Sequence, residues 1–205
     1  MNTKIKQNGF ILMETIIAIF MLMMVFVAIL SITGKTLLLT KNQNKTITAQ
    51  YLLQEGIEFI RNNRDSALNT GASWNDFTDE TGGGVCSSSS TVGPSFVKSL
   101  CQCISATGSK TCSVDPFLNN ITECPGNVCP EIAQMSNSTG RSIFCESNNG
   151  DCLSFGDARV TDFKRSIKIM PATSLNEVFV DVTVSWKNSG GQSVEKTIKT
   201  SLFNW

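Results

Sequence analysis

The sequence predicts an α+β fold in which a long N-terminal helix packs on a C-terminal antiparallel sheet, with a disulfide-rich loop region between them. Three observations predict it. An apolar run from Phe10 to Ile32 is followed by a segment without proline until Pro94. All eight cysteines lie between residues 86 and 152. The residues after 160 alternate between apolar and polar side chains, as half-buried strands do.

The apolar run is long enough to cross a membrane. Its 23 residues contain one charged residue, Glu14, and at about 1.5 Å per residue they match a bilayer core of about 30 Å. A secretory signal peptide fits poorly, because the run is too long, carries a carboxylate and is not followed by a small-residue cleavage site. In an ordinary single-pass anchor, Glu14 would cost roughly 2.5 kcal/mol or more. Glu14 therefore needs a partner.

The residues around Glu14 resemble a known processing motif. Residues 1–9 form a short polar leader with two lysines, and Gly9 precedes Phe10, with Glu14 four residues further on. This arrangement resembles the cleavage and methylation motif of the type IV pilin-like family. The resemblance implies that a prepilin peptidase cuts between Gly9 and Phe10 and methylates the new N-terminal phenylalanine. It also implies that Glu14 pairs with the amine of a neighbouring subunit during filament assembly.

This resemblance implies a structural subunit, either a minor pilin or a pseudopilin, of a type IV pilus, a type II secretion system or a DNA-uptake filament. The implied partners are other pilin or pseudopilin subunits, the prepilin peptidase, an inner-membrane assembly platform and the membrane, with nucleic acid only in a DNA-uptake filament. The chain would lie in the inner membrane with its C-terminal domain outside the cytoplasm, and then in an extracellular or periplasmic filament. The alternative is a filament-tip adhesin or receptor that binds through the cysteine-rich loops.

The composition argues against catalysis. The chain has no histidine, and therefore lacks the usual general base and the commonest ligand of catalytic zinc sites. Its 17 basic and 17 acidic residues balance, so the overall charge gives no indication of a nucleic-acid partner. We expect no catalytic residue, no cofactor and no metal.

The clustered cysteines indicate disulfides formed in an oxidising compartment. Lys4 and Lys6 favour a cytoplasmic N-terminus, but Lys35, Lys41 and Lys45 follow the apolar run, so charge alone does not determine the topology. The disulfides place the C-terminal part outside the cytoplasm. The disulfide candidates are Cys86, Cys101, Cys103, Cys112, Cys124, Cys129, Cys145 and Cys152.

Among these, Cys145 and Cys152 are predicted to bond to each other. They flank a turn at residues 147–151 between two short apolar segments, which predicts a hairpin over residues 143–155. A thiolate-bound metal in the cysteine-rich region and a calcium site at residues 146–151 are less favoured alternatives. The chain lacks histidine, and the spacing of oxygen ligands does not match an EF-hand loop.

The helix is predicted from about Phe10 to about Asp65, with a possible soft point at Gly34. Its part beyond the membrane carries an apolar stripe, which we expect to pack on the protein's own sheet. The stripe consists of Ala49, Leu52, Leu53, Gly56, Ile57 and Ile60. Turn-forming residues from 66 to 94 predict a loop.

The sheet is predicted to have three or four antiparallel strands. Alternation gives one strand a dry face at 163, 165, 167 and 169, and another at 178, 180, 182, 184 and 186. After a turn at 188–191, Val194, Ile198 and Leu202 are spaced to share a face on a third strand. The expected organisation is a leader at 1–9, a membrane-spanning helix at 10–32, an exposed amphipathic helix at 33–65, a cysteine-rich variable region at 66–160 and the sheet at 161–205.

Overall fold

The computed structural model describes residues 10–69, 74, 103–105, 107–136, 140–148, 150–153, 157–172 and 176–204. The chain divides into two compact units, Met1–Asn44 and Lys45–Trp205, and each is described by itself. One long helix, α1, spans Phe10–Asn69 and contributes to both units.

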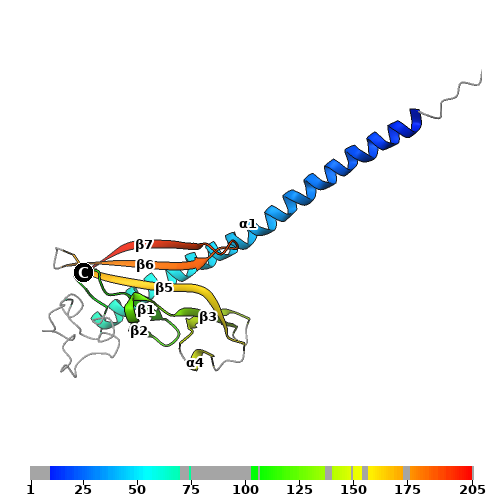
Figure 1. The fold of residues 1–205 in the computed structure, drawn as a ribbon. Coiled ribbons are helices and arrows are strands. Elements are labelled where there is room, and N and C mark those ends of the chain that lie inside the picture. The colour runs from blue at the N-terminus through cyan, green and yellow to red at the C-terminus, as the bar shows by residue number, and fades with distance from the viewer. Residues whose placement is uncertain are drawn as a thin grey trace, which may run out of the picture. The chain divides into compact units, whose positions relative to one another are not determined.

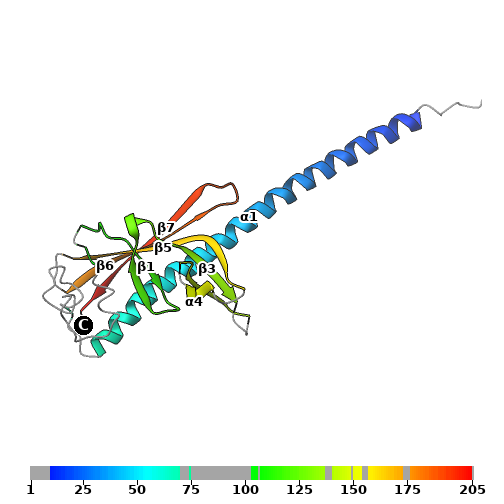
Figure 2. The ribbon, with the colours of Figure 1, turned by 60° about the horizontal axis from the view of Figure 1, so that its bottom comes forward.

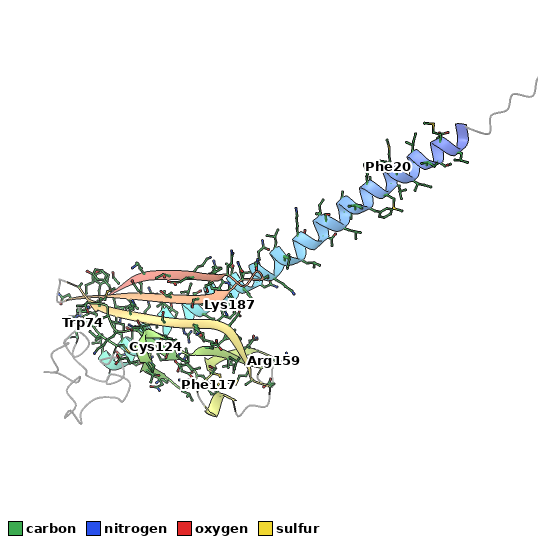
Figure 3. The ribbon with its side chains drawn as sticks, viewed as in Figure 1. Phe20, Trp74, Phe117, Cys124, Arg159 and Lys187 are labelled. Atoms are coloured by element: carbon green, nitrogen blue, oxygen red, sulfur yellow. A yellow bond between two sulfur atoms is a disulfide. The ribbon has the colours of Figure 1, made fainter. Side chains whose placement is uncertain are left out.

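In the first unit, every described residue is helical. The large apolar side chains from Leu12 to Ile32 are exposed, over a range from 48% for Ile17 to 70% for Leu30. Figure 3 shows side chains projecting outward along this part of α1, Phe20 among them. The helix is long and apolar enough to cross a membrane by length and composition.

The second unit contains the end of α1 and an antiparallel sheet of seven strands (Figure 1). The strands are β1 (Cys112–Asp115), β2 (Asn120–Glu123), β3 (Glu131–Ser136), β4 (Ser142–Glu146), β5 (Arg159–Pro171), β6 (Glu177–Lys187) and β7 (Ser193–Phe203). Two short helical turns lie between strands: a 3₁₀ turn at Pro125–Asn127 and α4 at Gly150–Leu153.

Strand β5 lies at the centre of the sheet. It pairs with β6 from Lys164 to Pro171, and β6 pairs in turn with β7. On its other edge β5 pairs with β3 near its start and with β1 at Ile167. Strands β2 and β4 extend the sheet beyond β1 and β3 respectively.

The predicted number of strands was too low, because β1, β2 and β3 lie in the region expected to be loops, whereas β4 coincides with the first strand of the hairpin predicted at 143–155. All four strands are four to six residues long. All four residues of β1 are buried, whereas β2 buries only Ile121. Neither strand therefore shows the alternation by which a half-buried strand is recognised.

The predicted stripe on α1 packs on the sheet. All six of its residues are buried, and the five with apolar side chains share one core with the inward-facing residues of β5 and β6. Figure 2 shows the end of α1 lying along one face of the sheet. Burial of this stripe removes apolar surface from water, which stabilises the fold by about 25 cal/mol for each Å² of apolar surface buried. The two-layer α+β arrangement follows from this contact.

The alternation predicted for the first two C-terminal strands is confirmed, but that of the third is not. In β5 and β6 the expected dry faces are buried. In β7 only Leu202 is buried, Val194 is partly buried, and Ile198 is 39% exposed. The core that covers β5 and β6 therefore leaves the middle of β7 uncovered.

The helix ends at Asn69, four residues beyond the predicted end at Asp65. In this last part Leu68 packs against the core, and buried Arg64 just before it donates from Nη1 to the carbonyl of Phe203 at 3.3 Å. Gly34 lies within the continuous helix. Of the loop predicted at 66–94, residues 66–69 belong to α1 and Trp74 is buried in the core; the remainder lies outside the described residues.

The hairpin predicted at 143–155 is wrong, although the bond between its cysteines is present. Strand β4 pairs with β3, with Ala133 opposite Cys145. Cys152 lies in the helical turn α4. The disulfide requires only that the two Cα atoms approach, here to 6.1 Å, and a helical turn allows this as well as a strand does.

Candidate functional site

The predicted processing and assembly residues lie at the start of α1. Gly9 lies outside the described residues, and Phe10 is the first residue of the helix. The side chain of Glu14 is exposed. Within the described part of the chain, no hydrogen bond or ion pair satisfies its carboxylate, whereas neighbouring Thr15 donates to the carbonyl of Leu12 at 2.9 Å. Glu14 is therefore available to a group outside its own chain.

Gly56 allows α1 to approach the sheet closely. A Cβ atom added at this position would lie 3.0 Å from Cγ1 of Val182 and 3.3 Å from Cδ of Arg165. Both distances are shorter than ordinary van der Waals contacts, so a larger residue here would push the helix away. By contrast, a Cβ added at Gly34 would meet no atom within 4 Å.

Arg165 joins the helix to the sheet from within the core. Its side chain is 2% exposed and forms an ion pair from Nη1 to Oε2 of Glu55 at 2.6 Å. Nη1 also donates to the carbonyl of Leu52 at 3.2 Å, and Nη2 donates to the carbonyl of Val114 at 2.8 Å. One buried guanidinium thus links α1, β5 and β1, while its Nε has no partner among the described residues.

Two buried carboxylates lie near this guanidinium. Asp115 accepts hydrogen bonds from the backbone N–H groups of Phe117 and Leu118 through Oδ1, and from that of Glu146 through Oδ2. The side chain of Glu146 leaves Oε1 without a hydrogen bond in the described part of the chain. Burial raises the pKa of Glu146, and the Asp115 charge adds to this, against the opposing effects of Ser113 and Arg165.

Lys45, the first residue of the second unit, links α1 to the sheet. Its ammonium donates to Oδ2 of Asp162 at 2.6 Å and to the carbonyl of Lys187 at 2.7 Å. These acceptors lie near the start of β5 and the end of β6, so one side chain links the helix to two strands. The charged partners are about one-third exposed, and such ion pairs contribute little to stability.

Among the described residues, three disulfides lie around the short strands. They join Cys103 to Cys112, Cys124 to Cys129, and Cys145 to Cys152. The candidates Cys86 and Cys101 lie outside the described residues. Two turns in this region carry exposed apolar groups: Val128 is 63% exposed inside the loop closed by Cys124 and Cys129, and Phe117 is 40% exposed in the turn between β1 and β2. Figure 3 labels Phe117 and Cys124 in this region.

A groove of about 480 Å³ lies between the exposed side of α1 and strand β4. Its lining combines aromatic, acidic and small polar side chains: Tyr51, Leu52, Gln54, Glu55, Glu58, Ser142 and Phe144. The acidic groups already have basic partners, since Glu55 pairs with Arg165 and Glu58 with Arg61 at 3.1 Å. The groove therefore offers no free charge to a ligand.

Comparison of the chain with models of known protein families, with curated proteins and with solved structures gives no match. The function must therefore be argued from the chain's own residues.

Sequence reasoning missed the buried polar cluster around Arg165. One signal was available: Arg165 occupies an inward position of an alternating strand, where only an apolar residue or a paired charge is stable. No comparable signal identifies Asp115 or Glu146, because the segments that hold them have no clear periodicity.

Proposed function

We propose that this chain is a membrane-anchored structural subunit of a type IV pilin-like filament, processed by a prepilin peptidase after Gly9. The observation that carries the proposal is the apolar surface of α1 from Leu12 to Ile32, which its own unit leaves exposed and which contains the lone carboxylate of Glu14. A lipid bilayer covers such a surface before assembly, and the helices of neighbouring subunits cover it in a filament.

Glu14 supports this proposal through its position. Processing would place a positive amine on Phe10, one helical turn before a carboxylate that has no partner in the described part of the chain. An isolated charge is costly in an apolar medium. Pairing the amine of one subunit with Glu14 of the next would therefore avoid the cost of an unpaired ammonium and that of an unpaired carboxylate together. The pair would be formed only when subunits meet in the correct register.

The second unit supports the same role through its construction. The stripe on α1, the close approach at Gly56 and the buried Arg165 attach the end of the helix to the sheet. In a subunit built this way, the position of the helix in a filament would determine the position of the domain attached to it. Such a protein would act through assembly and would need no catalytic residue.

The decisive experiment is mass spectrometry of the mature N-terminus in cells that contain a prepilin peptidase. The proposal predicts a chain that begins at Phe10 and carries one added methyl group. An intact leader in those cells, or a mature chain that starts beyond residue 20, would refute it. A Gly9→Val variant provides the control, because a β-branched side chain before the scissile bond should hinder the close approach of the peptidase.

A filament-tip adhesin or receptor is a second candidate, favoured by exposed apolar residues on two turns. Val128 lies in the loop closed by Cys124 and Cys129, and Phe117 lies in the turn between β1 and β2; loops on a rigid scaffold commonly bind ligands. Immunogold labelling along purified filaments separates the two roles. Label confined to the ends supports the tip role, and label along the shaft supports the structural one.

A further inference from the structure

Two large side chains on the outward side of α1 stay uncovered in the second unit. Ile47 is 49% exposed, and Tyr51, one helical turn later, is 66% exposed. Residues one turn apart are neighbours on the surface of a helix, so the two form one row. The polar residues 40–46 separate this row from the membrane-spanning part of α1. A bilayer that holds that part is therefore not expected to cover the row.

The groove between α1 and β4 continues this row. Tyr51 and Glu58 line it from α1 and lie two turns apart, about 10 Å along the helix axis. Ser142 and Phe144 line it from β4, where alternate residues share one side of the strand. The groove thus has a helix as one wall and a strand as the other. Side chains at i, i+4 and i+7 on a second helix match a groove of this length.

The charges around the groove favour an uncharged occupant. Its two carboxylates are already paired within the chain, Glu55 with Arg165 and Glu58 with Arg61. A basic occupant that took Glu55 would leave the buried guanidinium of Arg165 without its partner, which is strongly unfavourable. An acidic occupant would be repelled by both carboxylates. An apolar segment meets neither obstacle and can pack on the ring of Tyr51.

The same chain contains an apolar segment of this kind. Residues 16–32 of α1 include no charged residue, and their large apolar side chains are exposed. Once this segment leaves a membrane, protein must cover it. Glu14 sets the N-terminal limit of the segment, because a further carboxylate would face Glu55 and Glu58 in the groove.

We propose that this groove, together with Ile47, receives residues 16–32 of α1 from a second copy of this chain, with the two helices parallel. Copies anchored in one membrane point in the same direction, so a parallel arrangement is the one available to them. The groove and the apolar segment are different surfaces, and such a contact can repeat from copy to copy in an open filament. The inference rests on the proposed function and names the surface on which one subunit holds the helix of another.

Site-specific photo-cross-linking in assembled filaments tests this contact. A benzophenone amino acid in place of Tyr51 should bond, on irradiation, to a residue between 16 and 32 of another copy, identified by mass spectrometry of the linked peptides. Filaments grown from a mixture of isotopically light and heavy chains should give linked peptides of mixed mass, which shows that two copies are joined. The same probe at Glu58 should reach a residue about seven positions further along the partner helix, because parallel helices advance together.

Phe179 provides the matched control for the probe. It is aromatic and 41% exposed, and it lies between Val178 and Val180, which face the core. Its side chain is therefore on the face of the sheet away from α1, and the probe there should not link to residues 16–32. A Tyr51 probe that links to any other segment or to a different protein, or that gives no product, would overturn the proposal. A reversed order of the Tyr51 and Glu58 products would do the same.

A charge placed in the groove tests the contact independently. Tyr51→Glu adds a carboxylate beside Glu55 and Glu58, and should lower incorporation into filaments about tenfold or more, because the apolar segment would bury an unpaired charge. Tyr51 is exposed in the single chain, so leader processing and the free energy of unfolding should not change. Phe179→Glu should assemble as the wild type does. Equal incorporation of the two variants would contradict the proposal.

Mass spectrometry of the N-terminus in the same samples separates this inference from the filament proposal. A wild-type chain that keeps its leader and enters no filament refutes the filament proposal, and this inference with it. A processed chain in filaments whose Tyr51 probe does not reach residues 16–32 refutes this inference alone.

Discussion

The two parts of α1 are equally regular as a helix but lie in different environments. From Leu12 to Ile32 the apolar side chains surround the helix and are exposed, whereas from Ala49 to Ile60 they form one stripe that the sheet buries. A helix that is apolar on all sides requires a membrane or other helices, and one with a stripe requires a single partner surface. The first part thus leaves its apolar surface uncovered by its own unit, and the second has its apolar stripe covered by its own chain.

The sharpest test of this difference is Glu14→Ala, which should abolish or strongly reduce incorporation into filaments while leaving processing, insertion and folding of the second unit unchanged. In the proposed filament, removing the carboxylate eases insertion but leaves the amine of a neighbouring subunit without its partner. Filament yield and N-terminal mass spectrometry measure the two effects.

Added salt should not restore assembly of this variant, because screening hardly reaches a buried ion pair. Normal incorporation of Glu14→Ala into filaments would contradict the role assigned to the carboxylate.

A matched pair of leucine truncations compares the two parts directly. Leu52 is fully buried, so Leu52→Ala should lower the free energy of unfolding of the second unit by about 2 to 5 kcal/mol. Leu22 is 57% exposed in the first unit, and Leu22→Ala should leave that free energy unchanged. Denaturant unfolding of the protein in detergent, followed by tryptophan fluorescence, provides the measurement. An equal loss of unfolding free energy in the two variants would contradict the distinction between the two parts of α1.

A pair of glycine substitutions tests the close approach between α1 and the sheet. Gly56→Leu should destabilise the second unit by about 1 to 3 kcal/mol, because the added side chain would overlap Val182 and Arg165. Gly34→Leu places the same side chain where a Cβ meets nothing within 4 Å, and it should leave the second unit unaffected. The same unfolding assay measures both variants. An unchanged free energy of unfolding in Gly56→Leu would show that α1 can move away from the sheet to make room for the side chain.

The smallest expected effect concerns the pH dependence of the second unit. Burial raises the folded-state pKa of Glu146 above its ordinary value of 4.5. The contribution of this group to stability is therefore fully present below about pH 4.5 and is lost as the pH rises through the folded-state pKa. Glu146→Gln should flatten this dependence and raise stability at neutral pH relative to the wild type.

Glu123→Gln, at an exposed position of β2, provides the control and should follow the wild type over the whole pH range. Unfolding free energies measured from pH 4 to 8 check both variants. A Glu146→Gln protein whose stability falls in parallel with the wild type as the pH rises would show that another group is responsible.

The sequence by itself determined the elements whose periodicity is long and regular. Helix α1, its apolar stripe and the alternating faces of β5 and β6 follow from local patterns, because each side chain's environment repeats with the geometry of its own element. The Cys145–Cys152 bond was also predictable, since short sequence separation brings these residues close in many conformations.

Only the tertiary structure decided which short segments join the sheet and how charge is buried within it. Strands β1 and β3 pair with β5, which lies later in the chain, and β2 and β4 pair with β1 and β3; their burial follows from these partners rather than from any repeat of their own. Likewise, Arg165 is stable inside because Glu55 and two carbonyl groups from separate elements converge on it. The exposure of Ile198 has the same origin: alternation defines the face of a strand, but the neighbouring layer decides whether that face is covered.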